Sequence, residues 1–290
     1  MGLTPSERRI RPSSTGTSVR VQEVGTGEPV LFLHGEISPG SGWAPLVAHL
    51  PGVRSLLVDR PGTGLSAPYR ITASNLPRIG TAFVADLLDG LGLGAAHVVA
   101  TSFGGHLALR SAAATPHRIL RMVQLGCPAF AENGRVPPLV KVLTWRWARR
   151  AATGLPATPL ATRVILRQLG HAKSLDHGTL PSGFLDYHLA VQRHTDTMHQ
   201  DGELIAGRAP AEALVALDDG ALARVSAPTL FLWGADDAFG GPGMAQRFLT
   251  AMPNADLRVI PDAGHLPWLD DPPGVAETTL SFLTAADVRS

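Results

Sequence analysis

A serine, a pair of aspartates and a histidine stand at intervals along the chain, and together such side chains can activate a nucleophile. Ser102 lies in the segment Ala-Thr-Ser-Phe-Gly-Gly, and His265 lies in Pro-Asp-Ala-Gly-His-Leu. Between them, Asp236 and Asp237 follow a Trp-Gly-Ala segment. A serine hydroxyl is a weak nucleophile until a base removes its proton, and the base needs an acid to orient it. The order serine, aspartate, histidine is therefore that of a candidate catalytic triad.

The residues around Ser102 predict a strand, a sharp turn and the start of a helix. Small residues at Ala100 and Gly104 let the strand and helix approach closely, with the Ser102 hydroxyl exposed on a strained turn. The helix start presents free N–H groups to a developing oxyanion, and the amide of Phe103 is the best placed. Because the pattern is Ala-x-Ser-x-Gly rather than Gly-x-Ser-x-Gly, the segment alone also fits an ordinary strand–helix turn.

The candidate residues need a framework, and short apolar runs ending in Gly, Asp or Ser supply it. Such runs are typical of strands buried on both faces of a parallel sheet. Helix-like segments lie between them, notably 79–91 and 103–114, and this alternation predicts an α/β fold with a mostly parallel twisted sheet flanked by helices. The predicted strands are Ser18–Val24, Val30–His34, Arg54–Asp59, His97–Thr101, Arg118–Leu125, Thr229–Trp233 and Leu257–Ile260.

The alternation stops between residues 129 and 225, where several amphipathic helices are broken by Pro and Gly. The predicted helices cover 138–151, 161–170, 183–199 and 209–218. A helical insertion cannot continue a parallel sheet, so we expect a cap over the carboxyl ends of the strands, where open α/β sheets bind ligands. The expected organisation is a loose N-terminal arm over 1–17, a core over 18–128 and 226–290, and a cap over 129–225.

Composition excludes several classes of protein. The 290 residues are 44% hydrophobic and 17% charged, with a formal net charge of +1, so the chain is neither disordered nor a polyanion binder. We therefore expect no nucleic-acid partner. The apolar runs are too short for a membrane span, and the N-terminus lacks the apolar stretch of a signal peptide. All basic residues but Lys141 and Lys173 are arginines, which favours a bacterial, cytoplasmic protein.

Metal and disulfide chemistry find no support in the sequence. Cys127 is the only cysteine, so we interpret it as a small buried hydrophobe rather than part of a disulfide or zinc cluster. The five histidines of the cap region form no HExxH or comparable pattern, and we predict no metal and no cofactor.

With these motifs in place, the chain resembles the α/β-hydrolase superfamily over about residues 18–128 and 226–288. Leu33-His34-Gly35 matches the segment of the oxyanion loop, and the eight residues Asp59 to Ser66 match an Asp-Arg-x-Gly-x-Gly-x-Ser loop. The resemblance implies Ser102 as nucleophile and His265 as general base and then acid. It implies Asp237 as the orienting acid, with Asp236 as the alternative. It also implies an oxyanion hole formed by the backbone amides of Phe103 and Glu36.

The loop after His34 departs from the family, because Glu36 and Ile37 stand where small residues are common. A carboxylate beside an oxyanion hole is unfavourable, so we expect Glu36 to turn away or pair with an arginine, with a role in substrate recognition left open. Arg146, Arg149 and Arg150 form either a solvated face or a carboxylate-binding group. The residues expected to line the substrate pocket are Trp43, Phe184, Tyr187, Phe239 and Leu266.

The leading hypothesis is a serine hydrolase that cleaves an ester, lactone or thioester of a small to medium apolar substrate through a Ser102 acyl-enzyme. The glycine-rich loop ending at Trp43 also resembles that of carbon–carbon bond hydrolases, which usually carry Asn and Trp where this chain has Thr101 and Leu266. Carbon–carbon cleavage of a diketone is therefore the alternative. A cofactor-free lyase or a ligand-binding protein of the same fold also stays open. A small molecule is the expected partner, and a homodimer is possible.

Overall fold

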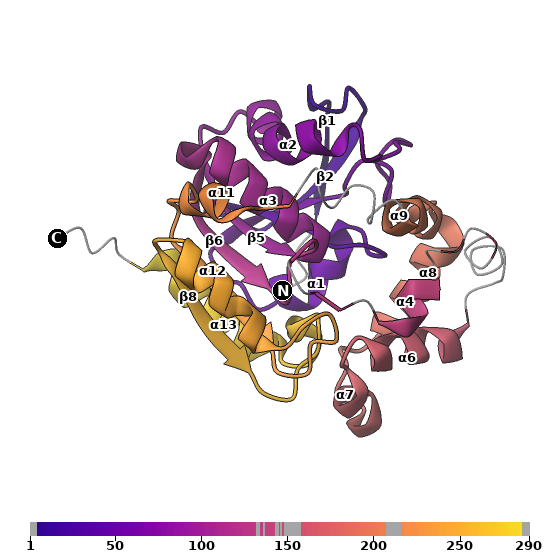
Figure 1. Ribbon diagram of the computed structural model, residues 1–290. Coiled ribbons are helices and arrows are strands. Elements are labelled where there is room, and N and C mark those ends of the chain that lie inside the picture. Colours follow the sequence, from indigo (N-terminus) through magenta and orange to yellow (C-terminus); the bar gives the residue numbers. More distant parts are fainter. Residues whose placement is uncertain are drawn as a thin grey trace.

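In the computed structural model the chain is described over residues 5–131, 134–135, 137–142, 145, 147, 158–206 and 216–285. A single eight-stranded sheet runs through it in the order β1-β2-β4-β3-β5-β6-β7-β8 (Figure 1). β1 and β2 are antiparallel to their neighbours, and the other strands are parallel. The strands are β1 Ser6–Ile10, β2 Val19–Val24, β3 Glu28–Leu33, β4 Val53–Val58, β5 Ala96–Thr101, β6 Ile119–Leu125, β7 Thr229–Gly234 and β8 Ala255–Ile260.

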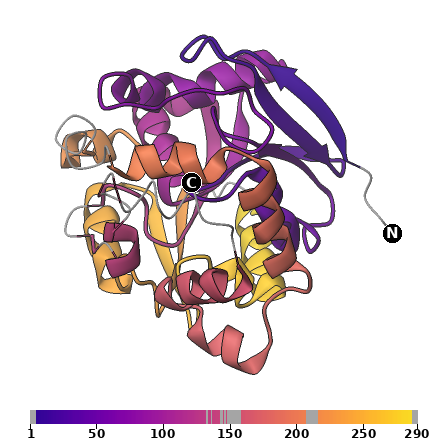
Figure 2. The ribbon, with the colours of Figure 1, turned by 90° about the vertical axis from the view of Figure 1, so that its right-hand side faces the viewer.

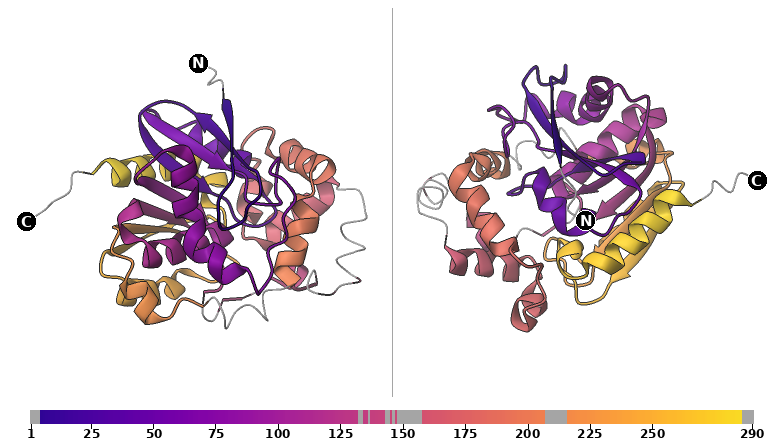
Figure 3. Two further views of the ribbon diagram at one scale, coloured as in Figure 1. Left: turned by 90° about the horizontal axis from the view of Figure 1, so that it is seen from above. Right: turned by 180° about the vertical axis from the view of Figure 1, so that it is seen from behind.

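Helices cover both faces of the sheet, and each face has its own apolar cluster. On one face, α2 buries Ile79, Phe83 and Leu87 at helical spacing and ends at Gly92, whose φ of 74° suits a residue without a side chain. On the other face, α13 lies along the sheet, as the right-hand view of Figure 3 shows. The core helices are α1 Ala44–Val47, α2 Leu76–Leu91, α3 Ser102–Ala114, α11 Asp219–Ala223, α12 Ala245–Ala251 and α13 Pro272–Thr284.

Four short 3-10 helices complete the core. They are η1 Gly40–Trp43, η2 Pro116–Arg118, η3 Pro242–Met244 and η4 Pro267–Leu269. Two of them meet beside the sheet, where the rings of Trp43 and Trp268 stack with centroids 4.3 Å apart. The predicted α/β-hydrolase architecture, a mostly parallel sheet flanked by helices with an inserted helical cap, is confirmed, and the insertion follows the sixth strand.

The cap lies between β6 and β7 and faces the viewer in Figure 2. Its described helices are α4 Pro138–Val142, α6 Pro159–Gln168, α7 Ala172–His177, α8 Phe184–His194 and α9 Thr197–Ala206. The single helix predicted over 183–199 is wrong, because Thr195 is extended and separates α8 from α9. The predicted helix over 209–218 lies outside the described residues up to 215, and residues 216–218 are not helical. Of the predicted helix over 138–151, the part beyond Val142 lies almost entirely outside them.

The expectation of a loose arm over residues 1–17 is wrong for the part that the structure describes. β1 pairs with β2 along its whole length, and Ser13 and Ser14 both bond to the Asp86 carboxylate of α2. Only Ile10 of β1 is buried, so the strand has a polar pattern typical of a sheet edge and no apolar alternation to announce it. No helix among the described residues is both long and apolar enough to cross a membrane.

Candidate active site

The turn from β5 into α3 places Ser102 at the carboxyl edge of the sheet in a strained conformation. Its φ is 48°, a left-handed value that a residue with a side chain adopts only at a cost. A Cβ atom on Gly104 would lie 2.2 Å from the Leu33 carbonyl oxygen, and one on Gly35 would lie 2.8 Å from Ser102 Cβ. Neither position tolerates a side chain, because β3, the loop that follows it and α3 pack tightly around Ser102.

His265 and Asp237 form a buried pair just past the ends of β8 and β7. The Nδ1 atom of His265 lies 2.9 Å and 3.0 Å from the two carboxylate oxygens of Asp237. Two backbone N–H groups also donate to this carboxylate, from Cys127 at 2.8 Å and from Phe239 at 2.9 Å. This arrangement fixes the carboxylate, which in turn orients the imidazole ring.

Of the two neighbouring aspartates, the structure places Asp237 against His265. Asp236 is exposed and pairs instead with Lys173 of the cap at 3.1 Å. The same lysine contacts Asp262, so these two aspartates hold a surface cation rather than the histidine. Cys127 is buried, as predicted, and its thiol donates to the Pro128 carbonyl at 3.5 Å.

The Glu36 side chain does not turn away from the site. Its Oε2 atom accepts a hydrogen bond from the Ser102 hydroxyl at 3.0 Å. Among the described residues no hydrogen bond joins Ser102 to His265, although both side chains line one cavity. The Ser102 hydroxyl is therefore held by the Glu36 carboxyl group and not by His265. Sequence analysis left open a role of Glu36 in substrate recognition, but it did not predict this contact.

The loop after Glu36 is strained and is held by a residue of the cap. Ile37 has a φ of 65°, a value that is a genuine outlier for a β-branched side chain. Its N–H donates to Asp201 of α9 at 2.6 Å. Asp201 also accepts two hydrogen bonds from Arg60, at 2.9 Å and 3.0 Å, and Arg60 donates to the carbonyl of Gly35 at 2.8 Å.

This ion pair is almost fully buried, with side-chain exposures of 1% for Arg60 and 2% for Asp201. Burial raises the pKa of Asp201, while the Arg60 guanidinium acts in the opposite direction. The guanidinium also lies over the Phe103 ring, 5.1 Å from its centroid. Sequence analysis did not single out Asp201, because a lone aspartate on an amphipathic helix carries no local signal for a partner 141 residues away.

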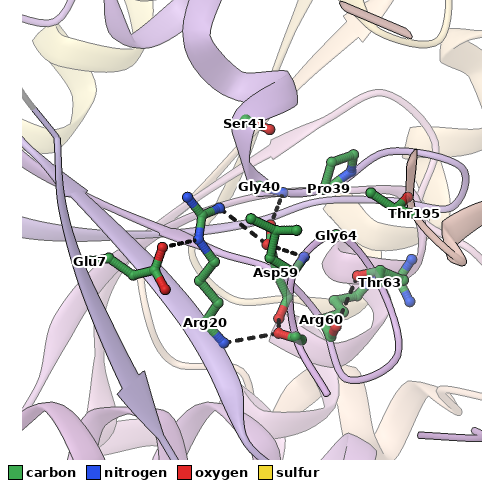
Figure 4. A network of polar contacts seen from close by, with 12 residues as sticks. Glu7, Arg20, Pro39, Gly40, Ser41, Asp59, Arg60, Thr63, Gly64 and Thr195 are labelled. Carbon is green, nitrogen blue, oxygen red and sulfur yellow. Dashed lines mark hydrogen bonds and ion pairs between the residues drawn. The ribbon is translucent and has the colours of Figure 1, made fainter. Parts of the chain in front are cut away.

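Asp59 holds the far end of the loop that follows Glu36 (Figure 4). Its carboxylate accepts from the Gly40 N–H at 2.8 Å and the Leu65 N–H at 2.9 Å. Arg20 pairs with Asp59 at 3.2 Å and with Glu7 of β1 at 2.7 Å, so the first two strands brace the loop. Asp59 therefore connects the loop after Glu36, its own loop and the first two strands.

His34 is a packed loop residue. Its Nε2 atom accepts from the Arg60 N–H at 3.0 Å, so Nδ1 carries the proton and lies 2.7 Å from the Gly35 carbonyl. Complete burial and the nearby Arg60 guanidinium hold the pKa of His34 well below its ordinary value. The imidazole is therefore neutral and bridges the two loops beside Ser102.

A second histidine–aspartate pair supports the loop that carries His265. His171 Nδ1 lies 2.8 Å from Asp270 Oδ2, and this carboxylate also accepts from the Gly264 N–H at 2.9 Å and the Ser174 hydroxyl at 2.5 Å. The Leu266 N–H points to His171 Nε2 at 3.4 Å. Neither His171 nor Asp270 was predicted as a site residue.

The cavity over Ser102 is lined mainly by apolar side chains from the core and from α6, α8 and α9. Four of the five predicted pocket residues line it, namely Trp43, Phe184, Phe239 and Leu266. Tyr187 does not. Its hydroxyl bonds to Ser41 at 3.0 Å, and burial raises its pKa to about 12. Arg146, Arg149 and Arg150, considered above as carboxylate-binding groups, lie outside the described residues.

Comparison with known proteins places these features in context. Residues 30–278 match the family model described as "Alpha/beta hydrolase family". The chain is 30% identical to the 2-hydroxy-6-oxononadienedioate/2-hydroxy-6-oxononatrienedioate hydrolase 2 of Pseudomonas putida, over 89% of this chain and 88% of that protein.

Solved structures show the same fold at lower identity. The 2-hydroxy-6-oxo-6-phenylhexa-2,4-dienoate hydrolase of Rhodococcus sp. strain RHA1 superimposes with a TM-score of 0.81 at 16% identity, covering 98% of this chain and all of that one. A carboxylesterase from Bacillus subtilis superimposes with a TM-score of 0.69 at 20% identity, covering 98% and 93%.

Proposed function

The chain belongs to the alpha/beta hydrolase family, and on that premise we propose that it is a serine hydrolase that cleaves a carbon–carbon bond beside a ketone. The similarity to the Pseudomonas putida protein carries this proposal. The substrate in that protein's name is a carbon chain with a hydroxyl, a ketone and two carboxylates, and it contains no ester. Water can therefore split such a molecule hydrolytically only at a carbon–carbon bond. The alternative from sequence analysis thus has better support than ester cleavage.

The proposed mechanism uses Ser102, His265 and Asp237 in the roles that their positions allow. His265 Nε2 takes the hydroxyl proton while Ser102 Oγ attacks the ketone carbon, and Asp237 stabilises the imidazolium through Nδ1–H. When the tetrahedral adduct collapses, the carbon–carbon bond breaks and its electron pair leaves as an enolate. His265 protonates this fragment. Water then attacks the Ser102 ester, with His265 as base, and releases a carboxylic acid.

The oxyanion of the adduct needs donors on the side of Ser102 away from His265. The Phe103 amide lies in the first turn of α3, where N–H groups have no partner inside the helix. The Glu36 amide follows Gly35, whose backbone packs directly against Ser102. We assign these two amides to the oxyanion hole, and the Ile37 N–H is excluded because Asp201 already occupies it.

Attack on a substrate also requires the Ser102 hydroxyl to exchange partners. It donates to Glu36 in this structure, so the hydroxyl must rotate toward His265 before its proton can be transferred. We infer that substrate binding beside Ser102 displaces the Glu36 contact. Glu36→Gln keeps a side-chain oxygen of similar size but removes the acid. It therefore separates the effect of the hydrogen bond on Ser102 reactivity from the effect of the carboxyl group's acidity and charge.

The test is turnover in ¹⁸O-water with a 2-hydroxy-6-oxo-dienoate, a neutral 1,3-diketone and a p-nitrophenyl ester. We expect both ketones to be cleaved, with ¹⁸O in the acid product and no turnover by Ser102→Ala. Cleavage without ¹⁸O would instead indicate a lyase. Failure to label Ser102 with a fluorophosphonate, together with no turnover of any substrate, would favour a ligand-binding protein.

Ester cleavage remains the second candidate because of two specific positions. Thr101 and Leu266 replace the Asn and Trp usual in carbon–carbon bond hydrolases, and the Thr101 hydroxyl is committed to the Leu125 carbonyl at 2.8 Å. If only the ester is hydrolysed, we attribute the loss of carbon–carbon bond cleavage to these two replacements. Exchanging them back, as Thr101→Asn with Leu266→Trp, should then increase diketone cleavage relative to ester cleavage.

A further inference from the structure

His188 of α8 stands out among the histidines that line the cavity over Ser102. His34 and His265 also line it, and both rings are bonded to protein groups. His188 is 9% exposed, and its buried Nε2 atom has no hydrogen-bond partner among the residues that the structure describes. Buried polar atoms are normally paired, because losing a hydrogen bond to water without replacement costs free energy. An unpaired ring nitrogen on the wall of a substrate pocket therefore indicates a ligand contact.

The surroundings of His188 determine what kind of contact it can make. Its ring packs beside Phe184, with centroids 6.2 Å apart and an interplanar angle of 25°. Burial lowers the pKa of His188 to about 4, so the imidazole is neutral at neutral pH. A neutral imidazole has one N–H donor and one acceptor nitrogen, and it brings no charge to balance an anion.

We propose that His188 binds an uncharged hydrogen-bonding group of the substrate, a hydroxyl or a carbonyl, on the cap side of the pocket. The inference rests on the proposed function only in taking this ligand to be the substrate. It separates this chain from the relatives, whose named substrates are carboxylates. Among the described residues that line the pocket there is no arginine or lysine, in agreement with an uncharged partner.

The test uses three ketone substrates that differ only at the end distant from the scissile bond, which carries a hydroxymethyl, an ethyl or a carboxylate group. Their dissociation constants are measured by calorimetry on the Ser102→Ala chain, with and without His188→Phe, so that binding is read without turnover. We expect the hydroxymethyl compound to bind about tenfold more tightly than the ethyl compound. His188→Phe, which keeps an aromatic ring beside Phe184, should reduce this ratio to about one.

Two further variants make the result specific. His188→Gln retains a donor and an acceptor and should restore part of the preference for hydroxymethyl. His194→Phe changes an exposed histidine on the same helix and should leave the preference unaltered. Thermal unfolding of each variant verifies that it is folded.

Three outcomes would overturn the proposal: no preference for the hydroxymethyl compound, a preference that survives His188→Phe, or tightest binding of the carboxylate. If none of the ketones binds, the same three end groups are tested on p-nitrophenyl esters. Selectivity that depends on His188 in the ester series would then support the inference and contradict carbon–carbon cleavage. Its absence there would contradict both.

Discussion

Two buried histidine–aspartate pairs lie close together at the carboxyl edge of the sheet, and they differ in what surrounds the histidine. In one pair, Asp237 holds His265 Nδ1, and the ring lines the cavity that contains Ser102. In the other, Asp270 holds His171 Nδ1 at a similar distance, but His171 Nε2 faces the Leu266 N–H. The comparison teaches that the pair alone does not make a catalytic base. We infer that His265 is the base, because it lines the cavity that contains Ser102, whereas His171 Nε2 is directed at a backbone N–H.

The cap contributes to both pairs. His171 and Ser174 come from the cap and bond to Asp270, and the His265 N–H donates to the carbonyl of Leu169, also in the cap, at 2.8 Å. We call His171–Asp270 the closed pair, because its histidine is bonded on both sides, and His265–Asp237 the open pair, because its histidine lines the cavity. The closed pair therefore supports the loop that carries His265. Substitutions that break one pair at a time should therefore separate a loss of kcat from a loss of unfolding free energy.

The largest effect is expected from Asp237→Asn in the open pair. The amide retains the shape of the side chain but favours the wrong imidazole tautomer, so kcat should fall by about 10⁴-fold. Steady-state kinetics on the preferred substrate measures this loss. The free energy of unfolding should change far less than the activation free energy, and a variant that simply unfolds would contradict the assignment.

A third buried carboxylate, Asp201, pairs with an arginine instead of a histidine and gives a sharper test of cap attachment. Asp201→Ala leaves the Arg60 charge buried without its partner, and unfolding in urea should show a loss of about 3–5 kcal/mol. Replacing both residues, as Arg60→Met with Asp201→Leu, should recover most of this stability. Activity should not recover, because Ile37 and Gly35 still lack the partners that hold the oxyanion loop.

Within the described part of the chain no carboxylate pairs with His188, and the effect of its imidazole should appear in the pH dependence of stability. The pKa is lowered from 6.5 in the unfolded chain to about 4 in the folded one. Between these values the unfolded chain binds the extra proton, so stability falls as the pH drops, by about 3 kcal/mol once the pH is below 4. Urea unfolding at pH 7 and pH 4.5 should show a smaller decrease for His188→Phe than for the unaltered chain. Equal decreases would contradict the neutral buried imidazole.

The smallest effect is expected from Asp270→Asn in the closed pair. The carboxylate accepts from His171, Gly264 and Ser174, and the amide can serve only part of this set. Stability should fall by about 2 kcal/mol, as measured by urea unfolding. Because Asp237 still orients His265, kcat should fall by less than tenfold. A loss comparable to that of Asp237→Asn would show that the closed pair takes part in proton transfer.

Sequence analysis predicted the site residues that lie just beyond the ends of strands. Ser102 and Asp237 follow the buried strands β5 and β7, and His265 follows the edge strand β8, which has no buried residue. Parallel strands bring their carboxyl ends to one edge of the sheet, so the three residues meet there. The polar edge strand β1 escaped prediction because only Ile10 of its five residues is buried. Asp201 and Asp270 escaped because their partners lie far away along the chain, where no local pattern can connect them.

The orientation of side chains in the loop after His34 depends on the same long-range packing. Glu36 was expected to turn away or pair with an arginine, yet its carboxyl group faces Ser102. Tyr187 was expected in the pocket, yet Ser41 draws its hydroxyl elsewhere. Both outcomes are determined by hydrogen bonds between core loops and neighbouring elements, and residue type alone did not specify them.

The contact from Asp201 to the strained Ile37 makes the cap and the catalytic core inseparable parts for protein engineering. A cap transplanted from another hydrolase of this fold would replace Asp201, whose carboxylate accepts the hydrogen bond from the Ile37 N–H. Such a chimaera needs an acidic residue at the position of Asp201, or glycine in place of Ile37 so that the loop can adopt its shape without support. Recombination between relatives should therefore succeed when residues 37, 60 and 201 are inherited together, or when residue 37 is glycine.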